Sequence, residues 1–182
     1  MTASQNSPLR IRPATAVDAA GIAQAHVESW RESYGGIVPE AHLAGLDVAV
    51  REQRWHDSFS GAKPPWQAFV AVSGIGGGNG GGDILGFVSL GAAREDFNGF
   101  AGELYALYLL RAAQGTGAGR QLFDAARQSL KSCGINAMYL WVLADNPAAG
   151  FYRHMGGREL RRKMLEIGGK TLEEIAYGWE EL

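Results

Sequence analysis

Two short stretches of the chain, residues 104–110 and 137–143, are apolar at almost every position. Runs of this length that are rich in Leu, Tyr and Val are typical of strands buried on both faces. Between them, from 117 to about 131, apolar residues recur every fourth position, which indicates a helix. A strand, helix and strand in this order predict two parallel neighbours joined by a right-handed crossover, with helices covering both faces of the sheet.

The remaining hydrophobic pattern predicts strands and helices that flank this unit. Alternation or short apolar runs predict strands at 9–12, 66–72 and 84–90, and a final hairpin of 159–167 with 170–179 that turns at Gly168 and Gly169. Helices are predicted from Thr15, through a second region that is interrupted at 45–47 and continues to Phe59, and from Asn146 to about Gly156.

At 182 residues with 46% apolar residues, the chain is expected to form a single domain over 1–182 with one substantial core. Residues 73–83, SGIGGGNGGGD, form a low-complexity stretch. Their composition predicts a flexible Gly-rich hairpin loop rather than a phosphate site, because no strand–loop–helix context surrounds them.

Charge and composition narrow the function classes. A net charge of −2 does not indicate binding to nucleic acid, which requires clustered positive charge. The N-terminus lacks an apolar leader and no apolar run approaches 18 residues, so we expect a soluble cytoplasmic protein without a membrane partner. Cys133 is the only cysteine and is expected to be a small buried residue. The four histidines have no ligand spacing, so we predict no metal, and His26 is expected to be a hydrogen-bonded core residue.

A glycine-rich turn follows the first apolar run, with the sequence Gln114-Gly115-Thr116-Gly117-Ala118-Gly119. A strand, glycine loop and helix direct free backbone N–H groups at an anion. Glycine allows close approach and positive φ. The spacing fits neither dinucleotide nor Walker loops, since the sixth position from Gly115 is Arg120 and the loop has no lysine. We interpret the turn as a pyrophosphate-binding loop.

The pattern Gln-x-x-Gly-x-Gly resembles the coenzyme A site of the GCN5-related N-acetyltransferase (GNAT) superfamily, which carries Arg/Gln-x-x-Gly-x-Gly/Ala at this strand-to-helix turn. A second motif, Asn146-x-x-Ala149-x-x-Tyr152, is similar to the family's later helix. The likeness covers nearly the whole chain. Arg111 stands where the family often has Pro, and Gly157 where Phe commonly follows Gly, and neither lies in the phosphate turn.

The resemblance implies an α/β (α+β) fold of GNAT type. Its sheet would be mixed and mostly antiparallel, with one parallel, splayed strand pair and helices on both faces. The implied activity is an acetyl-CoA-dependent N-acetyltransferase that acts on a primary amine of a small molecule or peptide by direct attack in a ternary complex. Relatives are often dimers, so a homodimer is possible.

The resemblance also implies a set of cofactor contacts. Backbone amides of the glycine turn would hold the pyrophosphate, the backbone of Leu107 and Leu109 would pair with pantetheine as an added strand does, and Asn146 would reach the pantetheine arm. The cofactor-binding set is Leu107, Leu109, Gln114, Gly115, Thr116, Gly117, Ala118, Gly119, Arg120, Asn146 and Tyr152.

Three residues are candidates for the chemistry of acyl transfer. Tyr152 would act as the general acid toward the departing thiolate, and the amide of Leu109 would stabilise the oxyanion. Glu103 matches a position where many relatives place a glutamate that acts as base directly or through water. Glu28 and Asp96 are second choices for the base. The structural alternatives are a packing tyrosine and an ordinary strand-start carboxylate.

The acceptor site is the least defined part of the prediction. The Ser-Trp-Arg-x-x-Tyr segment is similar to one that covers the acceptor in many relatives, so Trp30 and Tyr34 are expected to line that pocket. The alternative is that both rings pack a helix–helix junction. Two other functions stay open: a non-catalytic acyl-CoA-binding sensor, and a nucleotide-binding module built on the glycine turn.

Overall fold

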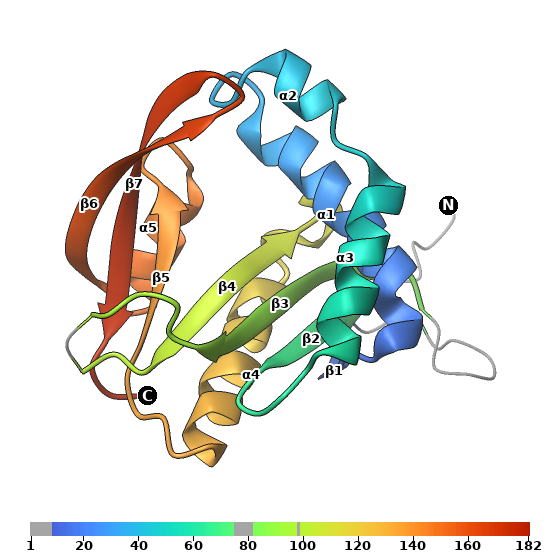
Figure 1. Cartoon of the computed structure of the whole chain (residues 1–182). Coiled ribbons are helices and arrows are strands. Elements are labelled where there is room, and N and C mark those ends of the chain that lie inside the picture. The colour runs from blue at the N-terminus through green and yellow to red at the C-terminus, as the bar shows by residue number, and fades with distance from the viewer. Residues whose placement is uncertain (1–8, 75–81, 98) are drawn as a thin grey trace, which may run out of the picture.

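The computed structural model describes residues 9–74, 82–97 and 99–182, which form seven strands and five α-helices (Figure 1). The strands are β1 (Arg10–Pro13), β2 (Gln67–Val72), β3 (Ile84–Ala92), β4 (Gly102–Leu109), β5 (Met138–Leu143), β6 (Arg158–Ile167) and β7 (Lys170–Trp179). The helices are α1 (Ala19–Tyr34), α2 (Glu40–Ala44), α3 (Val48–Ser60), α4 (Ala118–Ser132) and α5 (Ala148–His154), with 3-10 turns η1 (Ala16–Asp18) and η2 (Arg111–Ala113).

All seven strands belong to one sheet in the order β1-β2-β3-β4-β5-β7-β6. Every neighbouring pair is antiparallel except β4 and β5. These two parallel strands pair only at Gly102 with Met138 and Glu103 with Tyr139, and they separate beyond that point. The predicted mixed sheet with a splayed parallel pair is confirmed.

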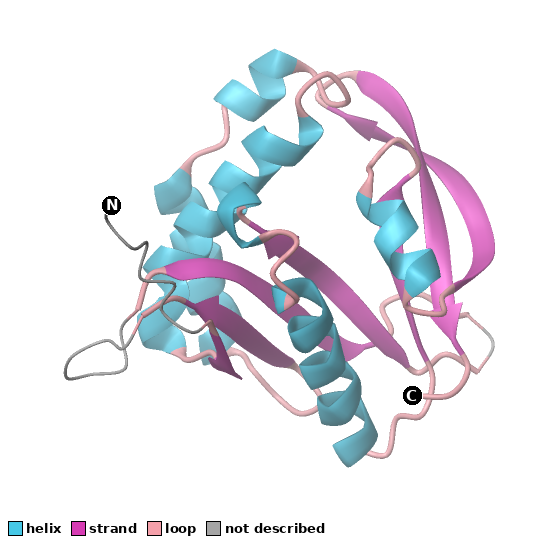
Figure 2. Ribbon diagram, turned by 180° about the vertical axis from the view of Figure 1, so that it is seen from behind, coloured by secondary structure: helices cyan, strands magenta, loops and turns pink. Residues whose placement is uncertain are grey.

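Helices cover both faces of the sheet, as predicted. Figure 1 shows α1, α2 and α3 on one face, and Figure 2, seen from behind, shows α4 and α5 on the other. On the first face Ile22 and Trp55 pack with Phe87 of β3. On the second, Leu122 and Phe123 of α4 pack into a cluster that includes residues of six strands and α5.

Local signals in the sequence account for the helix starts. The Asp18 carboxylate accepts a hydrogen bond from the backbone N–H of Thr15 at 2.8 Å and forms an ion pair with Arg12. The predicted capping box therefore forms, and a 3-10 turn leads into α1. The Asp47 side chain accepts from Ala49 N–H at 2.7 Å and begins α3. The predicted break in the second helical region therefore separates α2 from α3.

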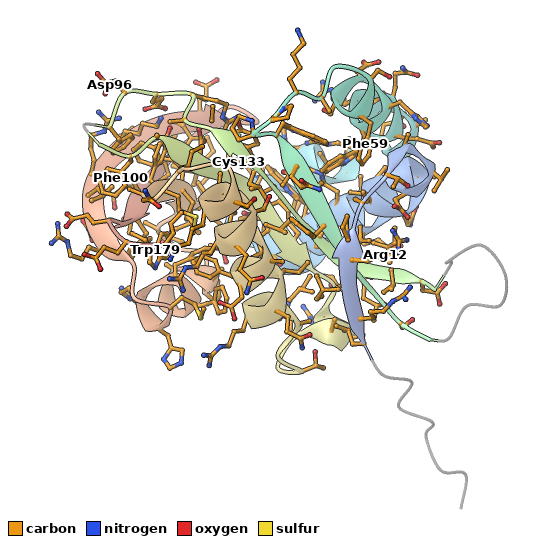
Figure 3. The ribbon with its side chains drawn as sticks, turned by 90° about the horizontal axis from the view of Figure 1, so that it is seen from below. Arg12, Phe59, Asp96, Phe100, Cys133 and Trp179 are labelled. Carbon is orange, nitrogen blue, oxygen red and sulfur yellow. The ribbon has the colours of Figure 1, made fainter. Side chains whose placement is uncertain are left out.

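Two predictions about single residues are corrected, and one loop stays untested. Cys133 is exposed rather than buried, because it caps the C-terminal end of α4 where the chain turns into solvent (Figure 3). His26 is largely buried, but its Nδ1 makes no hydrogen bond with any of the residues that the structure describes. The loop predicted over 73–83 is closed by a bond from Ser73 N–H to Asp83 C=O, and residues 75–81 lie outside the described residues.

Neither a membrane-spanning helix nor a cluster of metal ligands is found among the described residues. None of the helices in the described chain is both long and apolar enough to cross a membrane. Within residues 9–74, 82–97 and 99–182, no three side chains of the types that ligate metals come together.

The packing of α4 gives a stability prediction. Leu122 is fully buried between α4 and the sheet, so Leu122→Ala should lower the free energy of unfolding by about 2–5 kcal/mol, measured by urea denaturation. Val17, which is 87% exposed, supplies the control, and Val17→Ala should change stability by less than about 0.5 kcal/mol. Equal effects of the two substitutions would contradict this description of the core.

Candidate active site

A cavity of about 640 Å³ lies where β4 and β5 separate. Its walls come from the C-terminal end of α1, the strands β4 and β5, the glycine turn and α5. The lining residues are Glu32, Ser33, Tyr34, Leu104, Tyr105, Ala106, Leu107, Tyr108, Leu109, Arg111, Gln114, Gly115, Gly117, Gly119, Arg120, Leu140, Trp141, Val142, Asn146, Pro147, Ala148, Phe151 and Tyr152. A volume of this size is typical of small-molecule sites.

The backbone of β4 is open toward the cavity. Leu110 N–H bonds to Leu85 C=O at 2.8 Å, and the antiparallel register with β3 is regular from Ala106 onward. Because hydrogen-bonding direction alternates along a strand, the backbone groups of Leu107 and Leu109 point away from β3, toward the space that β5 has left. The N–H groups of both residues make no hydrogen bond within the described chain.

The glycine turn has the backbone geometry that its sequence predicts. Gly115 has φ 74° and Gly117 has φ 88°, in the left-handed region that favours glycine. Gly119 serves a different purpose, since a Cβ there would lie 3.3 Å from Leu109 Cδ1. The N–H groups of Gly119 and Arg120, in the first turn of α4, have no partner in the described chain, so they and the helix dipole are available to an anion.

Two polar side chains of the turn hold it together rather than face the cavity with free groups. Gln114 Nε2 donates to Leu109 C=O at 3.2 Å, which links the turn to the end of β4. The Thr116 hydroxyl donates to Ala113 C=O at 2.7 Å. Thr116 and Ala118 are not among the lining residues, whereas Gln114, the three glycines and Arg120 are.

Asn146 connects three elements at the far wall. Its Oδ1 accepts Ala148 N–H at 2.9 Å at the start of α5, and its Nδ2 donates to the Tyr34 hydroxyl at 3.2 Å. That hydroxyl lies 3.4 Å from the hydroxyl of Tyr108 on β4. Asn146 therefore lines the cavity, and its side chain also positions Tyr34. Tyr108 was not predicted, although it lies between the two predicted strand residues.

Tyr152 lies on α5 and lines the cavity with 5% of its surface exposed. No described residue makes a hydrogen bond with its hydroxyl, so the group is free to meet a ligand. Burial raises the pKa of Tyr152 well above its usual value, with a smaller contribution from Tyr34. The phenol is therefore protonated throughout the physiological pH range, as a proton donor must be.

Glu103 lies at the last paired position before the two strands separate, and only 2% of its side chain is exposed. Its carboxylate accepts hydrogen bonds from the backbone N–H of Arg94 at 2.9 Å and from the Tyr139 hydroxyl at 3.0 Å. It also forms an ion pair with the Arg94 guanidinium. Glu103 is not among the lining residues of the cavity. Desolvation raises the pKa of Tyr139 to about 12, so its phenol remains a donor.

The other predicted residues fall in different places. Tyr34 lines the cavity. Trp30 does not, but its ring packs against the Tyr34 ring with 4.8 Å between the two ring centroids. Glu28 accepts a bond from Gln24 on α1. Asp96 lies in the β3–β4 loop at the outer edge of the molecule (Figure 3). Residues that sequence reasoning missed include Glu32, Phe151 and Trp141, which come from three different elements and share no motif.

Comparison with known proteins places this geometry in a family. Residues 24–156 match the model described as the acetyltransferase (GNAT) family. The chain belongs to the GNAT family. It is also 35% identical over 173 residues to YuaI of Bacillus subtilis (strain 168), an uncharacterized N-acetyltransferase, with 94% of this chain and 93% of YuaI covered. Acetyl transfer is the general reaction of this GNAT protein's family.

Solved structures share the fold of this GNAT chain. PaiA N-acetyltransferase from Thermoplasma acidophilum, solved in complex with coenzyme A, has a TM-score of 0.62 and 19% identity, covering 92% of this chain and 98% of PaiA. The protein yncA from Salmonella typhimurium, solved with its cofactor acetyl-CoA, has a TM-score of 0.66 and 18% identity, covering 95% and 94%. At these identities the likeness concerns the fold.

Proposed function

We propose that this GNAT protein transfers the acetyl group of acetyl-CoA to a primary amine of a small molecule or peptide. The observation that carries the proposal is a set of backbone N–H groups on cavity-lining residues that make no hydrogen bond in the described chain, those of Leu107 and Leu109 on β4 and of Gly119 and Arg120 on α4. An extended, partly peptide-like arm followed by a pyrophosphate matches such a set in both shape and polarity.

The residues present fit the cofactor in two further respects. The turn at Gly115 and Gly117 carries no side chain that would hold a phosphate away from the amides. The apolar side chains of Leu104, Leu107 and Phe151 line the same cavity and suit the uncharged part of the arm. Arg120 lines the cavity and is 73% exposed; its guanidinium lies 3.7 Å from the Asp124 carboxylate, so it adds a partly compensated positive charge.

Acetyl-CoA supplies an acetyl group that is activated as a thioester. We assign the amide of Leu109 to the developing oxyanion, because this N–H faces the cavity without a partner. The nitrogen of the acceptor forms the new C–N bond while the C–S bond breaks, and the Tyr152 hydroxyl gives its proton to the departing sulfur. A single direct transfer requires no acyl-enzyme.

The position of the only cysteine supports direct transfer. Cys133 lies at the C-terminal end of the 15-residue α4, whereas the glycine turn lies at its N-terminal end. The two ends are about 22 Å apart at 1.5 Å per residue. An acetyl-cysteine at that position could not form beside the proposed thioester site.

Glu103 remains our proposed base, acting at a distance. Because its carboxylate is not part of the cavity wall, the proton lost by the amine would reach it through water or through Tyr139, whose hydroxyl it already holds at 3.0 Å. The homodimer and the cytoplasmic location stay predictions.

Acetyl-CoA should stabilise the folded protein. At about 100 times its dissociation constant it would add roughly 2.7 kcal/mol, equal to about 5–10 °C in melting temperature for a chain of this size. Thermal unfolding with acetyl-CoA, NAD or ATP measures this directly. A shift with NAD or ATP but none with acetyl-CoA would replace the proposal with a nucleotide-binding module. Binding without thiol release from any amine would favour the non-catalytic sensor.

A further inference from the structure

Arg51 on α3 is a half-buried arginine without an acidic partner. No carboxylate of the described residues lies within 4.0 Å of its guanidinium, and no hydrogen bond from it is formed in that part of the chain. Its guanidinium carbon lies 5.9 Å from the centre of the Trp30 ring. A partly desolvated cation without a counter-ion is unfavourable, so the position needs an explanation.

Other cations near the site do have partners within the protein. Arg161 donates to Glu95 at 2.8 Å, and Lys163, which lies 4.0 Å from the centre of the Trp141 ring, forms an ion pair with the same glutamate. Arg94 is paired with Glu103. Arg111, on the cavity wall, forms no ion pair in the described chain but donates to the Glu32 backbone carbonyl at 3.2 Å. Arg51 has neither kind of partner among the described residues.

The surroundings of Arg51 offer further unpartnered polar atoms. Within the described chain, neither the indole Nε1 of Trp30, which is buried near the Tyr108 hydroxyl, nor the buried Nδ1 of His26 makes a hydrogen bond. Burial, helped by the charge of Arg51, lowers the pKa of His26 to about 3, so this ring is neutral. Arg51 is therefore the cation of this group of side chains.

Arg51 does not itself line the cavity, but a series of ring contacts connects it to two residues that do. The Trp30 ring lies 4.8 Å from that of Tyr34, and the His26 ring stacks on Tyr108 at 5.1 Å. Tyr34 and Tyr108 both line the cavity. The charge of Arg51 is close enough to interact with Tyr108. Arg51 belongs to α3, which covers the face of the sheet opposite α4 (Figures 1 and 2).

We propose that Arg51 binds a carboxylate of the acceptor, so that the substrate is a small molecule carrying both a free amine and a carboxylate. A planar guanidinium pairs with a carboxylate through two parallel hydrogen bonds, which orients the molecule as well as attracting it. This inference rests on the proposed acetyltransferase function and specifies its acceptor.

The test compares amino acids with their own carboxamides. A panel of α-, β- and γ-amino acids, each with the matching carboxamide, is assayed by thiol release at saturating acetyl-CoA. For the amino acid that reacts best, we expect Arg51→Gln to raise KM and thereby lower kcat/KM about 30-fold or more. The same substitution should leave unchanged the kcat for that acid, the KM for acetyl-CoA and the rates with carboxamides.

Two further variants make the comparison specific. Arg10→Gln removes an exposed arginine from a different element, β1, and should have no effect. Arg51→Lys keeps the charge without the planar fork, and should give an intermediate KM; this variant also serves if Arg51→Gln fails to fold.

Several outcomes would overturn the inference. One is an equal loss with acids and carboxamides, which would make Arg51 structural. Another is a wild-type enzyme that acetylates carboxamides as well as acids, or that acetylates none of the panel although acetyl-CoA still raises its melting temperature. In each of these cases the proposed cofactor site is unaffected, and only the proposed class of acceptor is wrong. Absence of any acetyl-CoA effect would instead remove the proposed function itself.

Discussion

Replacing Gly117 with glutamate is expected to raise the dissociation constant for acetyl-CoA by at least about 100-fold, equal to about 2.7 kcal/mol. Gly117 has φ 88° and lies directly before α4, beside the free N–H groups of the first turn. A glutamate there adds a side chain with a negative charge at the position proposed for the pyrophosphate, and the positive φ strains it. Isothermal titration with acetyl-CoA measures the change.

The control separates the loss of the site from backbone strain. Gly134, just beyond the other end of α4, has φ 78°, and no atom lies within 4 Å of the position that a Cβ would take there, so Gly134→Glu carries a similar strain in open solvent. We expect both variants to lose similar stability while only Gly117→Glu loses acetyl-CoA. Unchanged affinity in Gly117→Glu would show that the cofactor binds elsewhere.

Replacing Tyr152 with phenylalanine is expected to lower kcat about 100-fold or more, with little change in the dissociation constant for acetyl-CoA. General acid catalysis typically contributes a factor of this size, and the substitution removes only a hydroxyl that no described residue binds. Steady-state kinetics by thiol release, together with titration of the cofactor, measure the two quantities separately.

The pH profile and a second tyrosine complete this test. Because burial raises the pKa of Tyr152, ionisation of this phenol should not reduce wild-type kcat below about pH 10. Tyr177 on β7 is fully buried, its hydroxyl makes no hydrogen bond with any described residue, and it does not line the cavity, so Tyr177→Phe should keep full activity. Wild-type kcat in Tyr152→Phe would remove the acid role.

The features of the fold that the sequence predicts correctly are local ones. The strand, glycine turn and helix around Gly115 and Gly117 could be predicted because positive φ at glycine and free N–H groups at a helix start depend on neighbouring residues alone. The same holds for the capping box at Asp18. The resemblance to the GNAT family extended these local signals to the order of the whole sheet, including its splayed parallel pair.

Contacts between distant segments were beyond such reasoning. Asn146 and Tyr34 are separated by 112 residues, and the burial of Glu103 under Arg94 depends on how the β3–β4 loop folds back. Periodicity indicates which face of an element is buried, but not which side chains of other elements meet it. The sequence therefore determined the phosphate-binding turn and the strands and helices that carry it. Only the tertiary structure decided that Arg51 lies beside Trp30 without a carboxylate, because the pairing of a charge depends on the packing of α1, α3 and the sheet.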